Sequence, residues 1–599
     1  MVPPLSTALK LALSAVLLAA TPIAAQDSPV TRVWEGKEYA CKCYPGDECW
    51  PQQNAWGSLN DTVDGNLHVH IPPEAACHNT FEGPLGTVET YDAQECQHVM
   101  QNYADEEWST GQQALLLWKY FTNHTCTPTN NPNEPCTLGY YGVYVIEAQT
   151  TDHIKASIDF ARENNLRLVI RNTGHDFIGR STGWGALIIN TFGFKDVQFI
   201  DAWTGAGDYD GGAVRVGAGI QGRDLLRQAF AHNVAVVTGE CPTVGIAGGL
   251  VGGGGHGPLT TLHGMVADNA LEFDAITAEG EFVTANADEN ADLFYALKGG
   301  GPSTYAVVTS ATFRTYPEEM ASGGELYINA TVPGTTEDQV WEGVRIFHSY
   351  ANHLVDHGLY VYYEVAPFTL RIRPYVAIGK TREELDAIVA PILADLTAAG
   401  VPFTATSKQF ASFFELYMDL FEDEGAGAFA LTGGWAFTHD DVAARNDDIV
   451  DAFKLVVSPR EDLAYTGVVI GHLFNPGYGW PSAADSATHP KWRNSTDFVI
   501  SIVPVPVDAS LEKKAELQDL LTNTVDAALR EAGPEGFTYI NEADPYQPNW
   551  QEAFWGDVYE RLVCIRRKWD PNGVFYSIAT PGTEDWEVIE YGTRLCKAV

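Results

Sequence analysis

The segment that decides the fold of this 599-residue chain reads Gly239-Glu240-Cys241-Pro242-Thr243-Val244-Gly245-Ile246-Ala247-Gly248-Gly249-Leu250-Val251-Gly252-Gly253-Gly254-Gly255-His256-Gly257. Ordinary cores do not accumulate glycine at this density, because each ordered glycine costs backbone entropy. Glycine is tolerated where the backbone takes unusual dihedral angles or approaches a ligand closely. The segment therefore predicts a ligand-binding backbone, with a glycine-rich surface loop as the structural alternative.

A Rossmann-type dinucleotide fingerprint is a second interpretation of the same segment. Its Gly-x-Gly-x-x-Gly order, with a following helix and a distal acidic residue, is not cleanly present. The run continues through Leu262-His263-Gly264-Met265-Val266-Ala267-Asp268-Asn269 without supplying those features. A ligand site of a different kind is therefore favoured.

A second segment of small and turn-prone residues directly follows the expected strand 166–170. It reads Arg171-Asn172-Thr173-Gly174-His175-Asp176-Phe177-Ile178-Gly179-Arg180-Ser181-Thr182-Gly183. Such residues after a strand expose successive backbone N–H groups, which can form a concave phosphate nest. No Gly-x-x-x-x-Gly-Lys-Ser/Thr occurs here, which excludes a phosphate-loop NTPase. Taken alone, the segment is equally compatible with a structural turn that carries a surface histidine.

Together the two segments resemble the berberine-bridge-enzyme-like branch of the vanillyl-alcohol-oxidase flavoprotein family. The similarity covers roughly 139–315 and resumes at Tyr539-Ile540-Asn541 and at Trp569-Asp570-Pro571-Asn572-Gly573-Val574-Phe575. The Cys-rich N-terminal part, with Cys49-Trp50-Pro51 and Leu59-Asn60-Asp61-Thr62-Val63, resembles fungal secreted members, including isoamyl-alcohol-oxidase-like proteins.

The resemblance implies one FAD held by two covalent bonds. The Thr-Gly-His turn carries the histidine bonded to the flavin 8α-methyl group, here His175, and the Cys-Pro-x-Val-Gly turn carries the cysteine bonded to flavin carbon 6, here Cys241. Of the ten cysteines, only Cys241 lies in a glycine loop far from the Cys-rich region. The remaining expected cofactor-binding residues are Arg171, Asn172, Thr173, Gly174, Asp176, Ser181, Pro242, Thr243, Gly245, Gly248, Gly249, Gly252, His256, Gly257, Ala267, Asn269, Val307 and Asn541.

The C-terminal motif bears on proton transfer. The family often has Tyr-x-Asn-Tyr, whereas this chain reads Tyr539-Ile540-Asn541-Glu542. Oxidation of an alcohol or amine needs a base for the O–H or N–H proton. Glu542 is therefore the candidate base, with Tyr539 as its neighbour over the ring. In the alternative, Glu542 makes structural hydrogen bonds and Asn541 only holds the flavin loop.

Other polar residues carry weaker signals. His256 and His263 flank the glycine run and are expected mainly to pack the loop. One expected strand carries Tyr360, Tyr362, Tyr363 and Glu364. Half of these residues should line the pocket because side chains alternate along a strand, and the sequence does not say which half.

The charge balance limits the partners. The chain has 36 basic and 78 acidic residues, a formal net charge of −42. Such a surface repels nucleic acid and anionic membranes, which bind clustered Lys and Arg. A small-molecule substrate and oxygen are the expected partners of a monomer without a metal site.

The N-terminus and the cysteines predict secretion. Lys10, the apolar run 11–20 and the small residues Ala24 and Ala25 are typical of a signal peptide cleaved after Ala25. Cys564 is expected to be a buried free thiol in a helix. With Cys241 also set aside, eight cysteines allow four disulfides, and Cys596 is expected to tie the C-terminus to the N-terminal region. A zinc site at Cys41-x-Cys43 is disfavoured, because no nearby histidine pair completes it. The Asn-x-Ser/Thr sequons are Asn60, Asn123, Asn329 and Asn494.

The order of expected strands and helices predicts an α+β protein that includes an α+β substrate domain with a mostly antiparallel sheet. The resemblance implies that the rest forms a two-part FAD-binding domain of the vanillyl-alcohol-oxidase type. The expected divisions are signal peptide 1–25, Cys-rich cap region 26–136, FAD-binding domain 137–320, substrate domain 321–532 and C-terminal return 533–599. Expected cap helices lie around 94–103 and 111–120. A β-α-β unit comprises 144–146, 152–163 and 166–170, followed by strands at 186–189, 213–216, 234–237 and 270–276. Substrate-domain strands are expected at 359–365, 370–377, 466–473 and 498–504, and helices at 336–356, 381–399, 439–456 and 508–532.

The sequence thus predicts a secreted FAD-dependent oxidase that oxidises a small alcohol, carbohydrate or phenol by two electrons and reduces oxygen to hydrogen peroxide. A flavin dehydrogenase or an oxidative cyclase of secondary metabolism would use the same cofactor site. A non-catalytic secreted binding protein on a flavin fold is the alternative from a different class.

Overall fold

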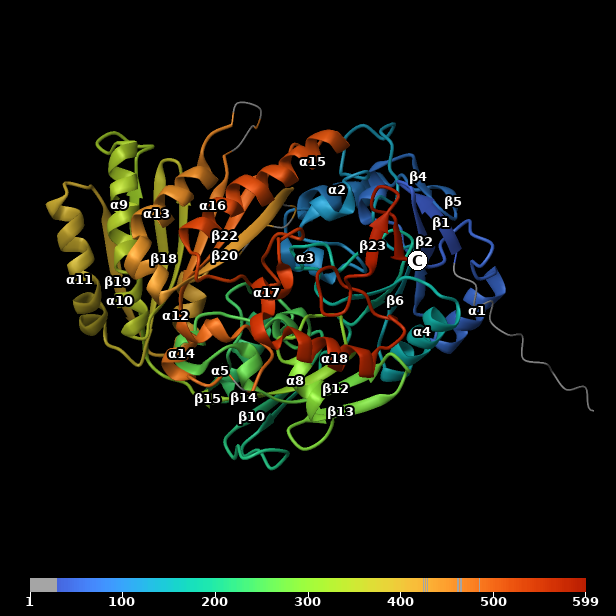
Figure 1. Ribbon diagram of the computed structural model, residues 1–599, viewed down its shortest axis with the longest axis horizontal. Coiled ribbons are helices and arrows are strands. Elements are labelled where there is room, and N and C mark those ends of the chain that lie inside the picture. Colours follow the sequence, from blue (N-terminus) through green and yellow to red (C-terminus); the bar gives the residue numbers. More distant parts are fainter. Residues whose placement is uncertain are drawn as a thin grey trace, which may run out of the picture.

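The computed structural model describes residues 30–599 except 424, 426, 428, 461, 462, 464, 465 and 484. The expected signal peptide, 1–25, lies outside the described residues. Helices α9 (Glu337–Ser349) and α11 (Arg382–Ala398) lie at one end of the molecule, and strands β1 (Val30–Trp34) and β2 (Lys37–Cys41) lie toward the other (Figure 1). None of the helices in the described ranges combines the length and apolar character that crossing a membrane requires.

The expected β-α-β unit is present. Strand β6 (Tyr144–Glu147) leads through α4 (Thr151–Glu163) to β7 (Leu168–Arg171). Helix α4 begins where the side chain of Thr150 accepts a hydrogen bond from the backbone N–H of His153. Strand β8 (Leu187–Asn190) lies between β6 and β7 and is parallel to both, while β3 (Leu67–Val69) adds an antiparallel edge. The turn after β7 therefore begins next to the inner strand β8.

A second sheet carries the glycine-rich segment at its side. All its strand pairs are antiparallel. Val214, Val216, Phe273 and Phe313 are buried on this sheet in the largest core of the molecule. The strand order is β13 (Phe282–Asn286), β12 (Ala270–Thr277), β14 (Ala306–Arg314), β10 (Ala213–Gly217) and β9 (Val197–Ile200); helices α5 (Gly222–Ala231) and α8 (Ala291–Leu297) and the ribbon β11 (Val234–Ala235) and β15 (Tyr316–Pro317) accompany it.

A seven-stranded antiparallel sheet separates two cores. In β17, Val361, Tyr363 and Val365 pack into the core beneath the helices, whereas Tyr360 belongs to the core shared with the glycine-rich segment. One face of the sheet therefore carries the helices, and the other faces the half of the molecule that contains the glycine-rich segment (Figure 1). The order is β19 (Thr404–Phe410), β16 (Ala321–Asn329), β18 (Thr369–Ile378), β17 (Tyr360–Ala366), β21 (Val468–Leu473), β22 (Ser495–Pro504) and β20 (Ala430–Thr438); the helices on the outer face are α9, α10 (Ala351–Asp356), α11, α13 (His439–Val457) and α16 (Asp526–Ala532).

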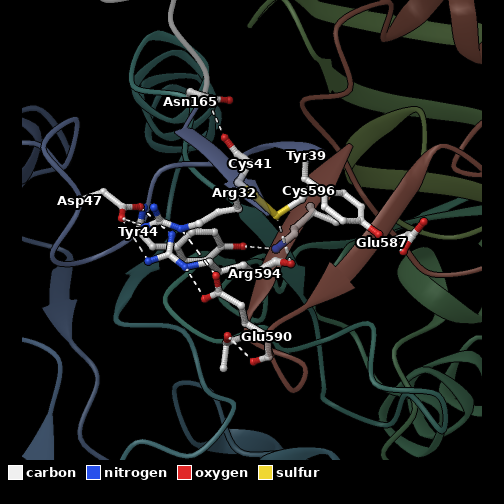
Figure 2. The surroundings of a disulfide bond; sticks show 12 residues. Arg32, Tyr39, Cys41, Tyr44, Asp47, Asn165, Glu587, Glu590, Arg594 and Cys596 are labelled. Carbon is white, nitrogen blue, oxygen red and sulfur yellow. Dashed lines mark hydrogen bonds and ion pairs between the residues drawn. A yellow bond between two sulfur atoms is a disulfide. The ribbon is translucent and has the colours of Figure 1, made fainter. Parts of the chain in front are cut away.

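The two ends of the chain are joined by a disulfide. Cys41 is bonded to Cys596, 555 residues away, in a sheet of order β1-β2-β24-β23, with β23 (Trp586–Ile589) and β24 (Arg594–Ala598). Figure 2 shows Arg594 beside this bond, where its guanidinium donates to Asp47 and Glu590. The expected link from Cys596 to the N-terminal region and the expected four disulfides are therefore confirmed. The other three pairs are Cys43–Cys49, Cys77–Cys96 and Cys126–Cys136.

The expectation of a buried thiol at Cys564 is wrong. Cys564 is a free cysteine, but it is exposed on helix α18 (Tyr559–Trp569). The buried face of α18 carries Leu562, Ile565 and Arg566. Position 564 follows Leu562 by two residues, about 200° around a helix, and so points to the opposite side.

Other boundaries also differ from the sequence expectation. In place of a helix over 111–120 there are α3 (Glu106–Gly111) and a 3₁₀ turn, Lys119–Thr122. Strands β16, β19 and β20 have no counterpart among the expected strands, because glycines and polar residues interrupt their alternation. The remaining helices and strands are α1 (Gln53–Thr62), α2 (Ala93–Asn102), β4 (Thr80–Gly83), β5 (Gly86–Glu89), α6 (Val251–Gly253), α7 (Thr260–His263), α12 (Phe413–Leu420), α14 (Pro476–Gly479), α15 (Leu511–Leu520) and α17 (Trp550–Trp555).

Candidate active site

A cavity of about 510 Å³ lies where both sequence-selected segments meet the seven-stranded sheet. Cavities of this size typically hold small ligands and cofactors. Its wall comes from the turn after β7, the glycine-rich run, strands β17, β21 and β22, and the C-terminal segment. Residues from the sequence-selected set that line it are Asn172, Thr173, Gly174, His175, Asp176, Ser181, Cys241, Gly245, Gly248, Gly249, Gly252, His256, Tyr539, Asn541 and Glu542.

Side-chain hydrogen bonds hold the turn after β7. Gly174 has φ +81°, a conformation that favours glycine. Asp176 then accepts hydrogen bonds from the backbone N–H groups of Ile178 and Arg180. The guanidinium of Arg180 pairs with the Asp176 carboxylate and also donates to Asn541 at 3.0 Å. The turn is therefore fixed to the C-terminal segment as well as to itself.

Arg171 lies beneath this turn and does not line the cavity. Its fully buried guanidinium donates to the carbonyl oxygens of Thr110 and Leu115, at 3.1 and 3.0 Å. Burial lowers its pKa to about 10, so it remains a cation at neutral pH. Arg171 thus joins the turn to the Cys-rich N-terminal region.

Glycine is required by space in the second segment. A Cβ atom at Gly245 would lie 2.0 Å from Oδ1 of Asn172, so the backbone of Gly245 lies directly against that side chain. A Cβ at Gly249 would meet no atom within 4 Å, because Gly249 faces the cavity. The run therefore serves two purposes: close contact with the first turn and an open face toward a ligand.

His175 and Cys241 come together at one edge of the cavity. Sγ of Cys241 lies 4.0 Å from Nε2 of His175, and the Thr243 hydroxyl lies 2.6 Å from the same nitrogen. Burial, and then the charge of Arg171, lower the pKa of His175 to about 3. The imidazole is therefore neutral at physiological pH and retains a nucleophilic lone pair.

Glu106 also reaches this edge. Its Oε2 accepts hydrogen bonds from Cys241 Sγ at 3.4 Å and from the Thr243 hydroxyl at 3.1 Å. Donor atoms of Glu106, His175 and Cys241 lie within 4.8 Å of one another, a spacing that is also compatible with a metal ion. The sequence predicts no metal, and the glycine-lined cavity beside these donors favours a larger organic ligand.

A second polar group lies at another part of the wall. Nε2 of His256 lies 3.1 Å from Oε2 of Glu542, and His256 is buried. The Tyr539 hydroxyl accepts hydrogen bonds from the Gly255 N–H and from the Asn541 amide. Burial, followed by the negative charge of Glu542, raises the pKa of Tyr539, which keeps it a phenol. His263 behaves as expected of a loop-packing residue and stacks on Tyr316, whereas His256 faces the cavity.

An ion pair that the sequence did not predict lies in the same wall. Nε2 of His472 lies 3.1 Å from Oε1 of Glu240. Burial lowers the pKa of His472, but the charge and hydrogen bond of Glu240 outweigh it and raise the pKa to about 9. The pKa of Glu240 lies below its ordinary value: burial raises it, but His472 and a hydrogen bond from Tyr360 outweigh burial. The cavity therefore contains an imidazolium–carboxylate pair at neutral pH.

Several expected cofactor-binding residues do not line the cavity. Val307 is buried, while its strand neighbours Ala306 and Val308 face the cavity, as strand alternation requires. Asn269 supports the loop by donating to the carbonyls of His263 and Met265. The full set outside the lining is Arg171, Pro242, Thr243, Gly257, Ala267, Asn269 and Val307.

The site residues that were not predicted differ in how strongly the sequence indicated them. Glu240 directly precedes Cys241, which is a weak signal for a place in the site. His472 lies within an expected strand, where alternation gives a weak signal that it faces the cavity. Tyr362 and Glu364 are the members of the tyrosine-rich strand that line the cavity. Glu106 gave no signal, because its partner Cys241 lies 135 residues away.

Comparison with known families gives two matches. Residues 143–286 match the family described as FAD binding domain, and residues 538–578 match the family described as berberine and berberine like. The two matched regions contain both sequence-selected turns and the Tyr539–Glu542 motif. The seven strands of the large sheet lie between these two regions in the sequence.

Curated relatives cover nearly the whole chain. The FAD-linked oxidoreductase ZEB1 of Gibberella zeae is 36% identical over 563 residues, 93% of this chain and 95% of the relative. The bifunctional decalin synthase calF of Penicillium decumbens is 32% identical over 95% of this chain and 98% of the relative.

Solved structures share the fold. The VAO-type flavoprotein MtVAO615 from Myceliophthora thermophila C1 has a TM-score of 0.85 and 31% identity, covering 93% of this chain and 100% of that one. The glucooligosaccharide oxidase of Acremonium strictum, described with a 6-S-cysteinyl, 8α-N1-histidyl FAD, has a TM-score of 0.61 and 16% identity, covering 88% and 99%. The latter likeness is one of fold alone.

Proposed function

Because this chain belongs to the vanillyl-alcohol-oxidase family of FAD-linked oxidoreductases, in its berberine-bridge-enzyme-like branch, we propose that it is a secreted oxidase with FAD bound covalently to His175 and Cys241. The observation that carries the proposal is the 4.0 Å separation of His175 Nε2 and Cys241 Sγ at the edge of the cavity. The low pKa of His175 leaves its imidazole neutral, and Cys241 is outside the four disulfides. The neutral imidazole is a nucleophile, and the thiol becomes one on deprotonation, as attachment to an electrophilic flavin needs.

The cavity wall fits a bound FAD. Asn172 Oδ1 and Arg180 Nη1 are buried polar atoms of cavity-lining residues that have no hydrogen-bond partner among the described residues. Buried polar atoms are normally satisfied, which points to partners on a ligand. The open face at Gly249 leaves room for that ligand. FAD, when bound, accepts two electrons from the substrate and passes them to oxygen, which yields hydrogen peroxide.

Glu542 is the proposed base for the substrate proton. It lines the cavity and is held by His256 at 3.1 Å. Tyr539 has a raised pKa and accepts two hydrogen bonds, so it serves to position rather than to deprotonate the substrate. His256 is hydrogen-bonded to Glu542 and therefore lies next to the carboxylate that takes the proton.

The substrate is proposed to be a small alcohol, carbohydrate or phenol. Ile470, Ile500 and Ile502 contribute apolar surface to the cavity wall. Phe177 and Phe421 add aromatic surface to the same cavity. An alcohol or phenol with an apolar body fits this lining best, since apolar surface is buried favourably there.

Secretion is proposed from the disulfides and the sequence. Four disulfides are typical of an oxidising compartment. The expected signal peptide and the sequons at Asn60, Asn123, Asn329 and Asn494 agree with that compartment. We further propose a monomer in which 137–320 and 533–599 bind FAD and 321–532 cover the substrate.

Two measurements test this function. Acid precipitation of the purified protein should leave the yellow colour in the pellet, and an aerated panel of alcohols, phenols and sugars should yield one peroxide per substrate oxidised. Free FAD in the supernatant would refute the covalent linkage, and substrate turnover without peroxide would refute the oxidase assignment.

The second candidate is a flavin dehydrogenase or oxidative cyclase. It is favoured by the relative named a bifunctional decalin synthase, which is 32% identical to this chain. Turnover with an artificial acceptor and without oxygen uptake would support it. Membership of an enzyme family argues against the non-catalytic binding protein.

A further inference from the structure

Glu106 belongs to the Cys-rich N-terminal region but contacts the glycine-rich segment. It is the first residue of α3 and is buried, with an exposed fraction of 5%. Its Oε2 lies 3.4 Å from Cys241 Sγ and 3.1 Å from the Thr243 hydroxyl. The same hydroxyl lies 2.6 Å from His175 Nε2, so one carboxylate is linked to both proposed attachment residues.

Several contacts fix α3 at this place. Asp105 caps the helix by accepting a hydrogen bond from the N–H of Trp108. The carbonyl of Thr110 accepts from Arg171, and the Thr110 hydroxyl accepts from Gln221 Nε2 at 3.1 Å. Gln221 Nε2 also donates to the carbonyl of Thr243 at 2.9 Å. These contacts fix both α3 and the backbone at Thr243, and therefore the position from which Glu106 reaches Cys241.

A thiol needs a base before it can attack. The thiolate is the nucleophilic form of cysteine, and an ordinary thiol with a pKa of about 8.5 is mostly protonated at neutral pH. Two acceptors lie near Sγ: the Glu106 carboxylate at 3.4 Å and His175 Nε2 at 4.0 Å. Nε2 of His175 lies farther from Sγ and is also hydrogen-bonded to the Thr243 hydroxyl at 2.6 Å. Glu106 is the better placed acceptor.

We propose that Glu106 is the base that takes the Cys241 thiol proton when Cys241 is joined to FAD. The inference rests on the proposed double attachment. The sulfur electron pair forms the S–C bond to flavin carbon 6, the C–H bond at that carbon breaks with loss of its proton, and its electron pair reduces the flavin. Molecular oxygen then takes the two electrons and two protons as hydrogen peroxide. Thiol, oxidised flavin and oxygen thus give the thioether of oxidised flavin and one peroxide.

The test compares Glu106→Gln with the wild-type chain. Glutamine keeps the volume and can still accept from Thr243, but it is a far weaker proton acceptor. Glu107→Gln is the matched control, since Glu107 is the next residue of α3 and is exposed. Full-length protein is incubated in air with added FAD, and samples taken over time are acid-quenched and digested. Mass spectrometry then gives the fraction of each peptide, with His175 or with Cys241, that carries FAD.

Glu106→Gln should slow attachment at Cys241 by about 100-fold, the usual size of a general-base contribution, while FAD still forms its bond to His175. The Glu107→Gln control should match the wild type at both residues. Equal rates at Cys241 in Glu106→Gln and in the wild type would overturn the proposal. A wild-type chain without FAD on Cys241 would instead refute the double attachment, and the role of Glu106 with it.

A second variant covers the case in which Glu106→Gln does not fold. Glu106→Asp keeps the carboxylate but moves it back by one methylene group. Attachment at Cys241 should then be slower than in the wild type and should reach completion, with His175 unaffected. A fully folded Glu106→Asp protein with unchanged attachment kinetics would contradict the dependence on the position of this carboxylate.

Discussion

The guanidinium of Arg180 donates a hydrogen bond at 3.0 Å to the side-chain oxygen of Asn541, a residue 361 positions later in the chain. Arg180 also pairs with Asp176 and is almost fully buried. The first turn of the cavity is thereby tied to the motif that carries Glu542. This contact explains how two sequence-distant segments form one wall.

Arg180→Lys should destabilise this wall. Lysine keeps the charge but lacks the planar set of donors that reaches both Asp176 and Asn541. Hydrogen bonds to charged groups contribute about 1.5–3 kcal/mol, so the free energy of unfolding should fall by about that amount in urea titrations. Arg227→Lys, in an exposed pair with Asp224, is the control and should change stability little. Equal stability of both variants would contradict the bridging role.

Glu542→Gln should slow the reduction of the flavin by substrate. Loss of a general base lowers the rate by about 10²–10⁴-fold, and flavin content should stay at the wild-type level. Anaerobic stopped-flow absorbance measures the rate. Glu552→Gln removes a nearby exposed carboxylate and should leave the rate unchanged. An undiminished rate in Glu542→Gln would favour the structural interpretation of this residue.

The His472–Glu240 pair should make stability fall as the pH rises. The folded-state pKa of His472 is raised from 6.5 to about 9, so the native chain binds this proton more tightly than the unfolded chain. The contribution is therefore complete below pH 6.5 and is lost as the pH rises through 9. One pKa unit corresponds to about 1.4 kcal/mol, so the shift of the His472 pKa sets an upper limit of roughly 3.5 kcal/mol on this contribution.

Denaturant unfolding at a series of pH values measures this effect. His472→Gln should flatten the slope of unfolding free energy between pH 6.5 and 9. His357→Gln, at an exposed histidine, should retain it. A slope that survives in His472→Gln would assign the pH dependence to another group.

Cys596→Ser should lower thermal stability without affecting FAD content. The Cys41–Cys596 bond spans 555 residues, and neither cysteine lines the cavity. Removal of a native disulfide typically costs about 2–5 kcal/mol. Calorimetry should show a lower Tm, whereas Cys564→Ser, at the exposed free thiol, should leave the Tm unchanged. An equal change of Tm in the two variants would contradict a stabilising role of the Cys41–Cys596 bond.

Local patterns predicted much of this fold. The β-α-β unit was predictable because 144–146 is a short apolar run, helix 151–163 is amphipathic and Thr150 is a typical helix start. Strands β16, β19 and β20 were not predicted. In β20, glycines at 433 and 434 interrupt the pattern, and all nine residues are buried, so no alternation marks the strand.

The candidate site was predictable only where chemistry was local in sequence. The turns with His175 and Cys241 are compact motifs, and the structure brings both to one cavity. The partners Glu106 and His472 lie in segments without such a motif, and only tertiary packing brings them to the site. Cys564 shows the same limit, since an apolar neighbourhood in sequence did not decide which face of α18 it occupies.

The most direct test of the account is flavin-peptide mass spectrometry of the wild-type holoenzyme. The protein is denatured, digested and searched for FAD on the peptides that contain His175 and Cys241. The account predicts one FAD per chain with both peptides joined to it. FAD that is released on denaturation, or that is found on neither peptide, would contradict the double attachment.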